Sequence, residues 1–288
     1  MQVIGLPYDG GIPSRPGARF GPRALRDSLT AFGSYTGRSE IPPMTDLGDL
    51  QLPTMNGSEA HRRMEDAARR AFSQNTFPIF IGGDHGCTGS IIRGFAAARP
   101  ETRLALISID AHLDVREYDD AASLSSGTPF RRALETAVLE GSRTAMIGLR
   151  PLANSRYYLD WARANGIVLL DVSDVAERGA RELARESLQK LMVGADALYL
   201  SIDMDAIDAA FAPGVSAPGA GGLTAREAID LIGEIASHPL LVGADIMELS
   251  PPYDLDGRTA RLAARLLLEV VARRAGAPDG GLQQDSGR

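Results

Sequence analysis

Short apolar runs recur along the 288-residue chain, and most are continuous rather than alternating between apolar and polar side chains. Uninterrupted runs of this length are typical of strands that are buried on both faces, as in a parallel β-sheet. We therefore predict strands at residues 3–6, 78–81, 104–109, 144–149, 167–170, 197–202 and 240–246.

Amphipathic stretches with the spacing of a helix lie between these runs. Thr224 and Glu227 have the spacing of a capping box, which marks the start of a helix. Strands that alternate with helices along the whole chain predict an α/β fold, with a doubly wound parallel sheet between two helical layers. The predicted helices are residues 58–72, 128–139, 155–165, 181–192 and 224–237.

The composition shows no linker-like shift that would divide the chain. We therefore expect one α/β/α domain over residues 1–275. Residues 276–288 are rich in Gly, Asp and Gln, so a disordered C-terminal tail is expected there.

The charge pattern narrows the possible partners. The net charge is −7 and no basic block interrupts the sequence, so nucleic acid is not an expected partner. No apolar run approaches the roughly 18 residues that span a bilayer, so no membrane association is expected. The single cysteine, Cys87, cannot form an internal disulfide, which fits a reducing compartment, and a cytoplasmic location is expected.

Acidic and imidazole side chains follow three of the predicted strands directly. The carboxyl ends of parallel strands meet at one edge of an open sheet, and such sheets bind their ligands there. These side chains are His85, in Gly-Gly-Asp-His; Asp110, His112 and Asp114, in Asp-Ala-His-Leu-Asp; and Asp203 and Asp205, in Asp-Met-Asp.

The spacing of these residues indicates a metal centre. Residues i and i+2 of an extended segment point to the same side, so Asp110 and His112 can face one site. The same holds for Asp203 and Asp205. Four carboxylates this close repel one another unless cations neutralise them, and two divalent ions supply that charge. Oxygen-rich ligands with one imidazole per metal favour Mn²⁺, and two such ions can lower the pKa of a shared water.

Each motif alone is more often a turn or a helix cap, but their combination is specific. The chain resembles the ureohydrolase family, which includes arginase, agmatinase, guanidino-acid hydrolases and formimidoylglutamase. The resemblance implies a three-layer α/β/α fold, two Mn²⁺ per subunit, a small amidine or guanidine substrate, and a homotrimer or homohexamer. It runs from about residue 3 to residue 272 and rests on the segments 15–23, 82–85, 110–114, 201–214 and 247–254.

The resemblance also implies roles for single residues. Asp114 would help to orient the attacking water, and Glu248 would bind the amidinium group of the substrate as its counter-ion. The implied metal ligands are His85, Asp110, Asp114 and Asp203 for one ion, and His112, Asp110, Asp203 and Asp205 for the other, so that Asp110 and Asp203 bridge the pair.

Two departures from the arginase and agmatinase patterns favour formimidoylglutamase. Ser126 stands where those patterns have a proton-shuttling histidine. The loop 214–219 reads Gly-Val-Ser-Ala-Pro-Gly instead of a Gly-Thr-Gly-Thr-Pro form.

N-formimidoyl-L-glutamate carries two carboxylates, which an arginine can pair with bidentately. Arg116 and Arg150, with Ser126 and Glu248, are therefore the predicted substrate-binding residues, although each arginine could instead form a structural salt bridge. An agmatinase or guanidino-acid hydrolase that releases urea, and a non-catalytic relative, are the alternatives.

Overall fold

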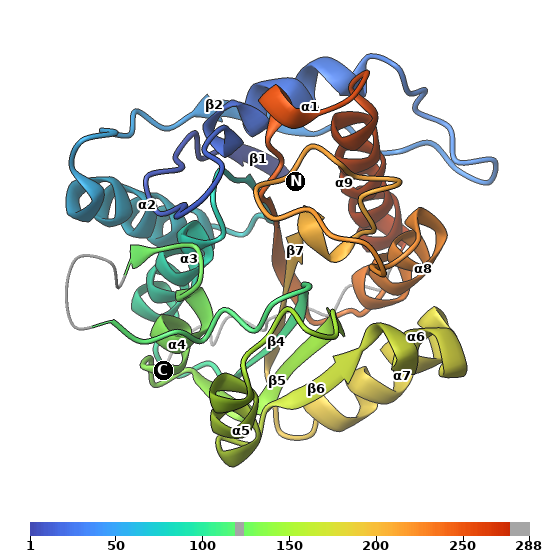
Figure 1. Cartoon of the computed structure of the whole chain (residues 1–288). Coiled ribbons are helices and arrows are strands. Elements are labelled where there is room, and N and C mark those ends of the chain that lie inside the picture. Colours follow the sequence, from blue (N-terminus) through green and yellow to red (C-terminus); the bar gives the residue numbers. More distant parts are fainter. Residues whose placement is uncertain (119–123, 277–288) are drawn as a thin grey trace, which may run out of the picture.

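The computed structural model describes residues 1–118 and 124–276. A single eight-stranded sheet forms the centre of this described part, and every pair of neighbouring strands in it is parallel (Figure 1). The predicted α/β class with a doubly wound parallel sheet is confirmed. In sheet order the strands are β2 (Thr45–Asp49), β1 (Gln2–Gly5), β3 (Pro78–Ile81), β8 (Leu241–Met247), β7 (Ala197–Asp203), β4 (Leu104–Ile109), β5 (Leu139–Leu149) and β6 (Val168–Asp171).

The sequence pattern located the buried strands well and missed the exposed one. Each predicted run lies within an observed strand or is shifted from it by one residue. The unpredicted strand β2 has the sequence Thr-Asp-Leu-Gly-Asp and is exposed along its whole length, so it carries no apolar run. Arg26 holds this edge strand in place, because its guanidinium pairs with both Asp46 and Asp49.

Helices cover both faces of the sheet, and each face has its own apolar core (Figure 1). Helices α2, α3, α4 and α5 pack on one face. The other face is covered by α1, α6, α7, α8 and α9. The bounds are α1 (Gly21–Leu29), α2 (Gly57–Phe72), α3 (Gly86–Ala98), α4 (Pro129–Leu134), α5 (Arg156–Ala164), α6 (Val172–Arg178), α7 (Ala180–Leu191), α8 (Ala225–Ala236) and α9 (Arg258–Gly276).

One helix prediction needs correction, and the predicted ranges leave out four helices, α1, α3, α6 and α9. The helix expected at 128–139 ends at Leu134, because Leu139 already belongs to β5 and pairs with Leu104 of β4. Helix α9 was not predicted, and it continues through Gly276, the first residue of the expected tail. The rest of that tail, residues 277–288, lies outside the described residues.

Among the described residues, no helix combines the length and the apolar character needed to cross a membrane.

Candidate active site

Polar side chains gather at the carboxyl ends of four adjacent central strands, in the order β3, β8, β7 and β4. Strands β3 and β4 follow one another along the chain, yet β8 and β7 lie between them in the sheet. Crevices at such a change in winding direction are the usual ligand sites of open α/β sheets. The sequence analysis placed ligands after three of these strands, and Glu248 follows the fourth, β8.

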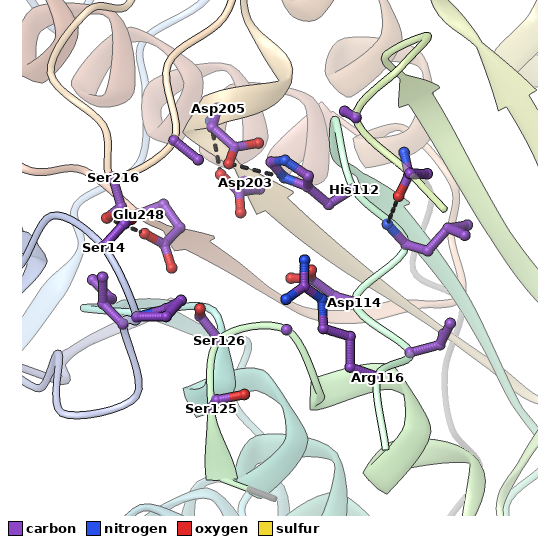
Figure 2. Close-up of a pocket in the computed structure, with 18 of the residues that line it drawn as sticks. Ser14, His112, Asp114, Arg116, Ser125, Ser126, Asp203, Asp205, Ser216 and Glu248 are labelled. Atoms are coloured by element: carbon purple, nitrogen blue, oxygen red, sulfur yellow. Dashed lines mark hydrogen bonds and ion pairs between the residues drawn. The ribbon is translucent and has the colours of Figure 1, made fainter. Parts of the chain in front are cut away.

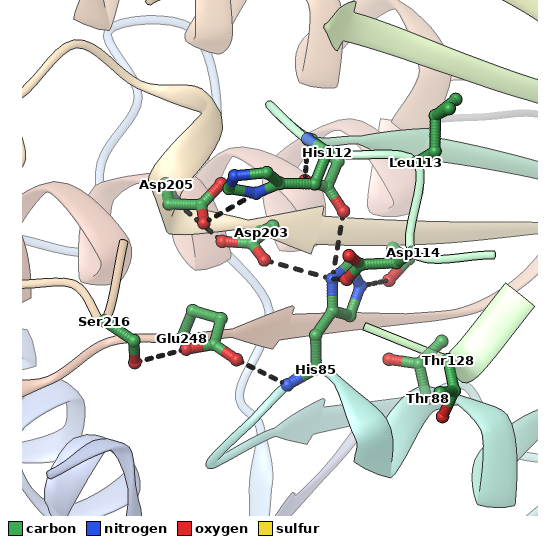
Figure 3. Close-up of polar contacts among 12 residues, drawn as sticks. His85, Thr88, His112, Leu113, Asp114, Thr128, Asp203, Asp205, Ser216 and Glu248 are labelled. Carbon is green, nitrogen blue, oxygen red and sulfur yellow. Dashed lines mark hydrogen bonds and ion pairs between the residues drawn. The ribbon is translucent and has the colours of Figure 1, made fainter. Parts of the chain in front are cut away.

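The imidazole of His85 lies at the centre of the first group of ligand atoms. Its Nδ1 is 3.0 Å from Asp203 Oδ2, 3.1 Å from Asp110 Oδ2 and 3.2 Å from Asp114 Oδ2 (Figure 3). His85 and Asp110 are fully buried. This group brings together four side chains from three separate loops that could hold one metal ion.

A second group of side chains lies beside the first. His112 Nδ1 is 3.1 Å from Asp205 Oδ2 and 3.6 Å from Asp110 Oδ1. Asp110 therefore contributes one oxygen to each group. Asp203, which the resemblance assigned to both metals, belongs only to the first group in this structure, so its bridging role stays a prediction.

The donor set fits two divalent cations. His85 Nδ1, Asp110 Oδ2 and Asp205 Oδ1 are buried polar atoms for which the described residues provide no partner with hydrogen-bond geometry. An ion held in the first group would give His85 Nδ1 and Asp110 Oδ2 a partner, and an ion in each group would neutralise the facing carboxylates.

A buried hydrogen-bonded chain fixes the orientation of His85. The Ser201 hydroxyl donates to Asp245 Oδ1 at 2.6 Å, so its oxygen is left to accept a hydrogen bond from His85 Nε2–H at 2.9 Å. Asp245 also accepts from the Tyr199 and Thr88 hydroxyls. Burial opposes the charged form of His85, but the facing carboxylates outweigh it and raise the pKa of His85 well above its usual range. Because Nε2–H donates to Ser201, a cation that displaces the proton from Nδ1 would have this nitrogen as its ligand. The sequence analysis missed these residues, although an Asp within the apolar run of β8 was a signal.

Burial and mutual repulsion disturb the carboxyl groups of the site. Burial and the charge of Asp205 raise the pKa of Asp203 well above its usual range. Burial, with the neighbouring Asp110, raises the pKa of Asp114 to about 6. Burial opposes the charged form of His112, but the carboxylates of Asp205 and Asp110 outweigh it and raise the pKa of His112 to about 12. The ion-free site therefore retains protons that cations would displace.

The metal-free protein is expected to lose stability as the pH rises from about 4 to 8. Asp114 and Glu248 retain protons in the folded chain up to pKa values of about 6 and about 8, whereas unfolded carboxyl groups release theirs near pH 4. At these two groups the folded chain thus binds more protons than the unfolded chain in this interval, so their contribution to the free energy of unfolding falls with rising pH.

His112 also lowers the free energy of unfolding as the pH rises above about 6.5. Its pKa is raised in the folded chain, so it keeps a proton there that it loses in the unfolded chain. Bound ions replace these protons, so the increase in Tm caused by Mn²⁺ should grow between pH 5.5 and 8. Thermal unfolding of chelated and Mn²⁺-loaded protein at several pH values measures both trends. A chelated protein that becomes more stable over this range would contradict the expectation.

A pocket of about 400 Å³ opens beside the two ligand groups. Figure 2 shows Glu248 on one side of it and Arg116 and Asp114 on the other. Glu248 Oε1 accepts a hydrogen bond from the backbone N–H of His85 at 2.8 Å, and Oε2 accepts one from the Ser216 hydroxyl. Burial and the nearby Asp84 raise the pKa of Glu248 to about 8. A cationic group in the pocket would favour its ionised form.

The two predicted catalytic residues share an unusual backbone conformation. Asp114 has a φ of 47° and Glu248 a φ of 65°, in the left-handed region that residues with side chains rarely adopt. The Glu248 backbone is held there by its N–H, which donates to Gly83 at 2.8 Å. Such conformations persist where surrounding contacts enforce them, and they concentrate at functional sites.

The predicted substrate-binding residues are placed differently from one another. Arg116 and Ser126 both line the pocket. The backbone N–H of Arg116 donates to the carbonyl of Gly127 at 2.8 Å, and that of Ser126 donates to the carbonyl of Gly11 at 3.0 Å. Hydrogen bonds from neighbouring loops therefore hold both residues in place.

Arg150 lies apart from the other predicted substrate-binding residues, and its role in substrate binding stays a prediction. Arg150 is not among the described residues that line the pocket. Its guanidinium instead donates to the backbone carbonyl of Asp205 and fills the space beside Gly219. These contacts favour a role in positioning the Asp205 backbone over direct contact with a substrate carboxylate.

Comparisons with known proteins agree with this geometry. Residues 1–272 match the model of the arginase family. The guanidinopropionase of Pseudomonas aeruginosa is 36% identical over 277 residues, which cover 94% of this chain and 85% of that protein. The crystal structure of formimidoylglutamase from Bacillus subtilis superposes with a TM-score of 0.91 at 29% identity, covering 96% of this chain and 87% of that one. Trypanosoma cruzi formiminoglutamase, with Mn²⁺ bound, gives a TM-score of 0.89 at 28% identity, covering 96% and 94%.

The chain belongs to the arginase family, as the sequence motifs had indicated. Its relatives in this family are metal-dependent hydrolases of amidino C–N bonds, and the chain is an enzyme of this class.

Proposed function

We propose that this enzyme is a formimidoylglutamase, which hydrolyses N-formimidoyl-L-glutamate to L-glutamate and formamide. The observation that carries the proposal is Ser126 at the position of the shuttle histidine, together with the sequence of the loop 214–219, at a pocket whose charges suit this substrate. Glu248 lies on one side of the pocket, suited to a cationic amidinium, and Arg116 lies on the other side, suited to a carboxylate. The likeness to two formimidoylglutamase structures supports it further.

In the proposed mechanism, side chains of the site hold the amidinium group of the substrate next to the attacking water. Two ions bound by the six ligands would lower the pKa of a water towards neutrality and stabilise negative charge. Glu248 pairs with the amidinium and turns its carbon towards the ligand groups. Asp114, at the junction of the first ligand group and the pocket, accepts a proton from the water. The leaving amine then receives its proton from Asp114 or from solvent, because Ser126 replaces the shuttle histidine.

Mn²⁺ is the proposed metal. Two imidazole nitrogens among four carboxylates form a ligand set that suits this ion. The Mn²⁺-bound Trypanosoma cruzi structure supports the same choice. A single domain over residues 1–275, a cytoplasmic location and a homotrimer or homohexamer stay predictions from the sequence, and light scattering of the purified protein tests the assembly.

A guanidino-acid hydrolase that releases urea is the second candidate. The 36% identity to guanidinopropionase favours it. Its substrates would also place a cation at Glu248 and a carboxylate near Arg116, so the charge arrangement does not separate the two. Ser126 and the loop 214–219 favour the formimidoyl substrate.

A substrate panel distinguishes these functions. The Mn²⁺-loaded enzyme is assayed with N-formimidoyl-L-glutamate, guanidinopropionate, guanidinobutyrate, agmatine and arginine, and formamide and urea are measured separately. The proposal expects the highest kcat/KM with N-formimidoyl-L-glutamate and release of formamide. Urea release from a guanidino acid at a higher kcat/KM would replace it with the second candidate.

Replacing Arg116 by Met is expected to raise KM for N-formimidoyl-L-glutamate by about 10- to 100-fold, because a charge-assisted hydrogen bond contributes roughly 1.5–3 kcal/mol. The expected change in kcat is small, since the carboxylate is remote from the reacting carbon. Arg156→Met is the matched control, because Arg156 is exposed and pairs with Asp160 outside the pocket. Steady-state kinetics of both variants test the assignment, which an unchanged KM in Arg116→Met would refute.

A further inference from the structure

The turn after β5 contacts both loops that carry the ligands of the second group. Asn154 lies in this turn and lines the pocket. Its Oδ1 accepts a hydrogen bond from the backbone N–H of Leu113 at 2.9 Å, and its Nδ2 donates to the backbone carbonyl of Ala111 at 2.9 Å. These two residues flank His112, so one carboxamide holds the backbone on both sides of that ligand.

Arg150, four residues earlier, adds contacts to the same loop and to its neighbour. Its backbone N–H donates to Ala111 at 3.0 Å. Its guanidinium donates to the backbone carbonyl of Asp205. The turn is therefore hydrogen-bonded on one side to the segment of His112 and on the other to the residue Asp205.

The ligand loop needs such external contacts. Residues 111–118 form no helix or strand, and the loop includes the left-handed Asp114. His112 keeps about a quarter of its side chain exposed, whereas His85 is fully buried and is fixed by Ser201. The contact with Ser201 thus fixes His85, whereas the hydrogen bonds from the turn hold the backbone on both sides of His112.

We propose that Asn154 and Arg150 form a clamp that positions His112 and Asp205 and thereby sets the affinity of the second metal site. This inference rests on the proposed two-metal function. Both residues are positioning residues, because they act through the backbone of the ligand loops. Asn154 lines the pocket, and its amide oxygen and one N–H of its Nδ2 bind the loop, so these loop contacts fix the orientation of its side chain.

The clamp is tested by titrating Mn²⁺ into chelated protein, with calorimetry for stoichiometry and electron paramagnetic resonance for coupling between neighbouring ions. Wild-type protein should take up two ions per chain. Asn154→Ala removes both hydrogen bonds, and the nearly isosteric Asn154→Asp keeps the acceptor while placing a carboxylate oxygen against the Ala111 carbonyl. We expect one site to weaken by about 10- to 100-fold in both variants, the range for residues that orient metal ligands, with loss of the coupled signal at limiting metal.

Asn165→Ala is the matched control. Asn165 follows α5, and its amide donates to the Trp161 carbonyl away from the site, so this variant should bind metal as the wild type does. Two sites of unchanged affinity in Asn154→Asp, with only KM raised, would overturn the clamp and make Asn154 a substrate contact. Wild-type protein that binds fewer than two ions would instead contradict the proposed function itself.

Discussion

Replacing Asp203 by Asn is expected to reduce kcat/KM by more than about a hundredfold and to lower the metal content of the purified enzyme. Changes to residues that merely orient metal ligands cost 10- to 100-fold, and Asp203 is itself a predicted ligand. Its Oδ2 lies 3.0 Å from His85 Nδ1, and its Oδ1 accepts the backbone N–H of Asp205. The amide removes one negative charge from a site that needs it to hold cations.

Asp196→Asn provides the matched control for this prediction. Asp196 directly precedes β7, at the opposite end from Asp203, and pairs with Arg103 on the surface. The control should retain full activity and metal content. Metal analysis and kinetics are measured on both variants. The two-metal proposal would be refuted if Asp203→Asn turned over substrate at the wild-type rate. Full turnover by the wild-type chain after its metal has been stripped would refute it as well.

The metal ligands could be predicted from the sequence because they lie in short motifs. His85 and Asp110 follow strands with clear apolar runs, Asp203 ends another, and parallel strands bring their carboxyl ends to one edge of the sheet. Local pattern and topology together thus predict which side chains meet.

The contacts that support these ligands could not be predicted from the sequence in the same way. Asp245 interrupts an apolar strand, but its three hydroxyl partners come from α3 and β7, far apart in the sequence. Asn154 and Arg150 lie in a turn whose direction depends on the packing of β5 against β4. The sequence showed that Arg150 was close to the site, and only the fold showed that its guanidinium points at the Asp205 backbone rather than into the pocket.

Replacing Glu248 by Gln is expected to lower kcat/KM by about 30-fold to several thousandfold while leaving the metal content unchanged. Removing one partner of a buried charged pair costs roughly 2–5 kcal/mol, and Glu248 is the predicted counter-ion of the amidinium. Its oxygens accept from the His85 backbone and the Ser216 hydroxyl, and it belongs to neither ligand group. A variant that keeps its normal metal content but loses activity would show that Glu248 acts on the substrate and is not a metal ligand.

Glu269→Gln is the control for the same chemical change at a buried carboxylate. Glu269 lies on α9, pairs with Arg265 and Arg273, and is remote from the pocket. This variant should keep wild-type kinetics and lose some stability with its ion pairs. A Glu248→Gln enzyme with the kinetics of this control would show that the amidinium is held elsewhere.

Stability and activity should move in opposite directions in Glu248→Gln. Burial and Asp84 raise the pKa of Glu248 to about 8, so its ionised form is unfavourable in the folded, metal-free chain. At pH 8.5 the neutral Gln avoids this cost, and the metal-free variant should unfold at a higher temperature than the wild type. At pH 6 the wild-type carboxyl group is protonated and the difference should shrink. The negative charge of Glu248 thus lowers the stability of the metal-free fold but is required for turnover. This trade-off is expected of a site that binds a cationic substrate.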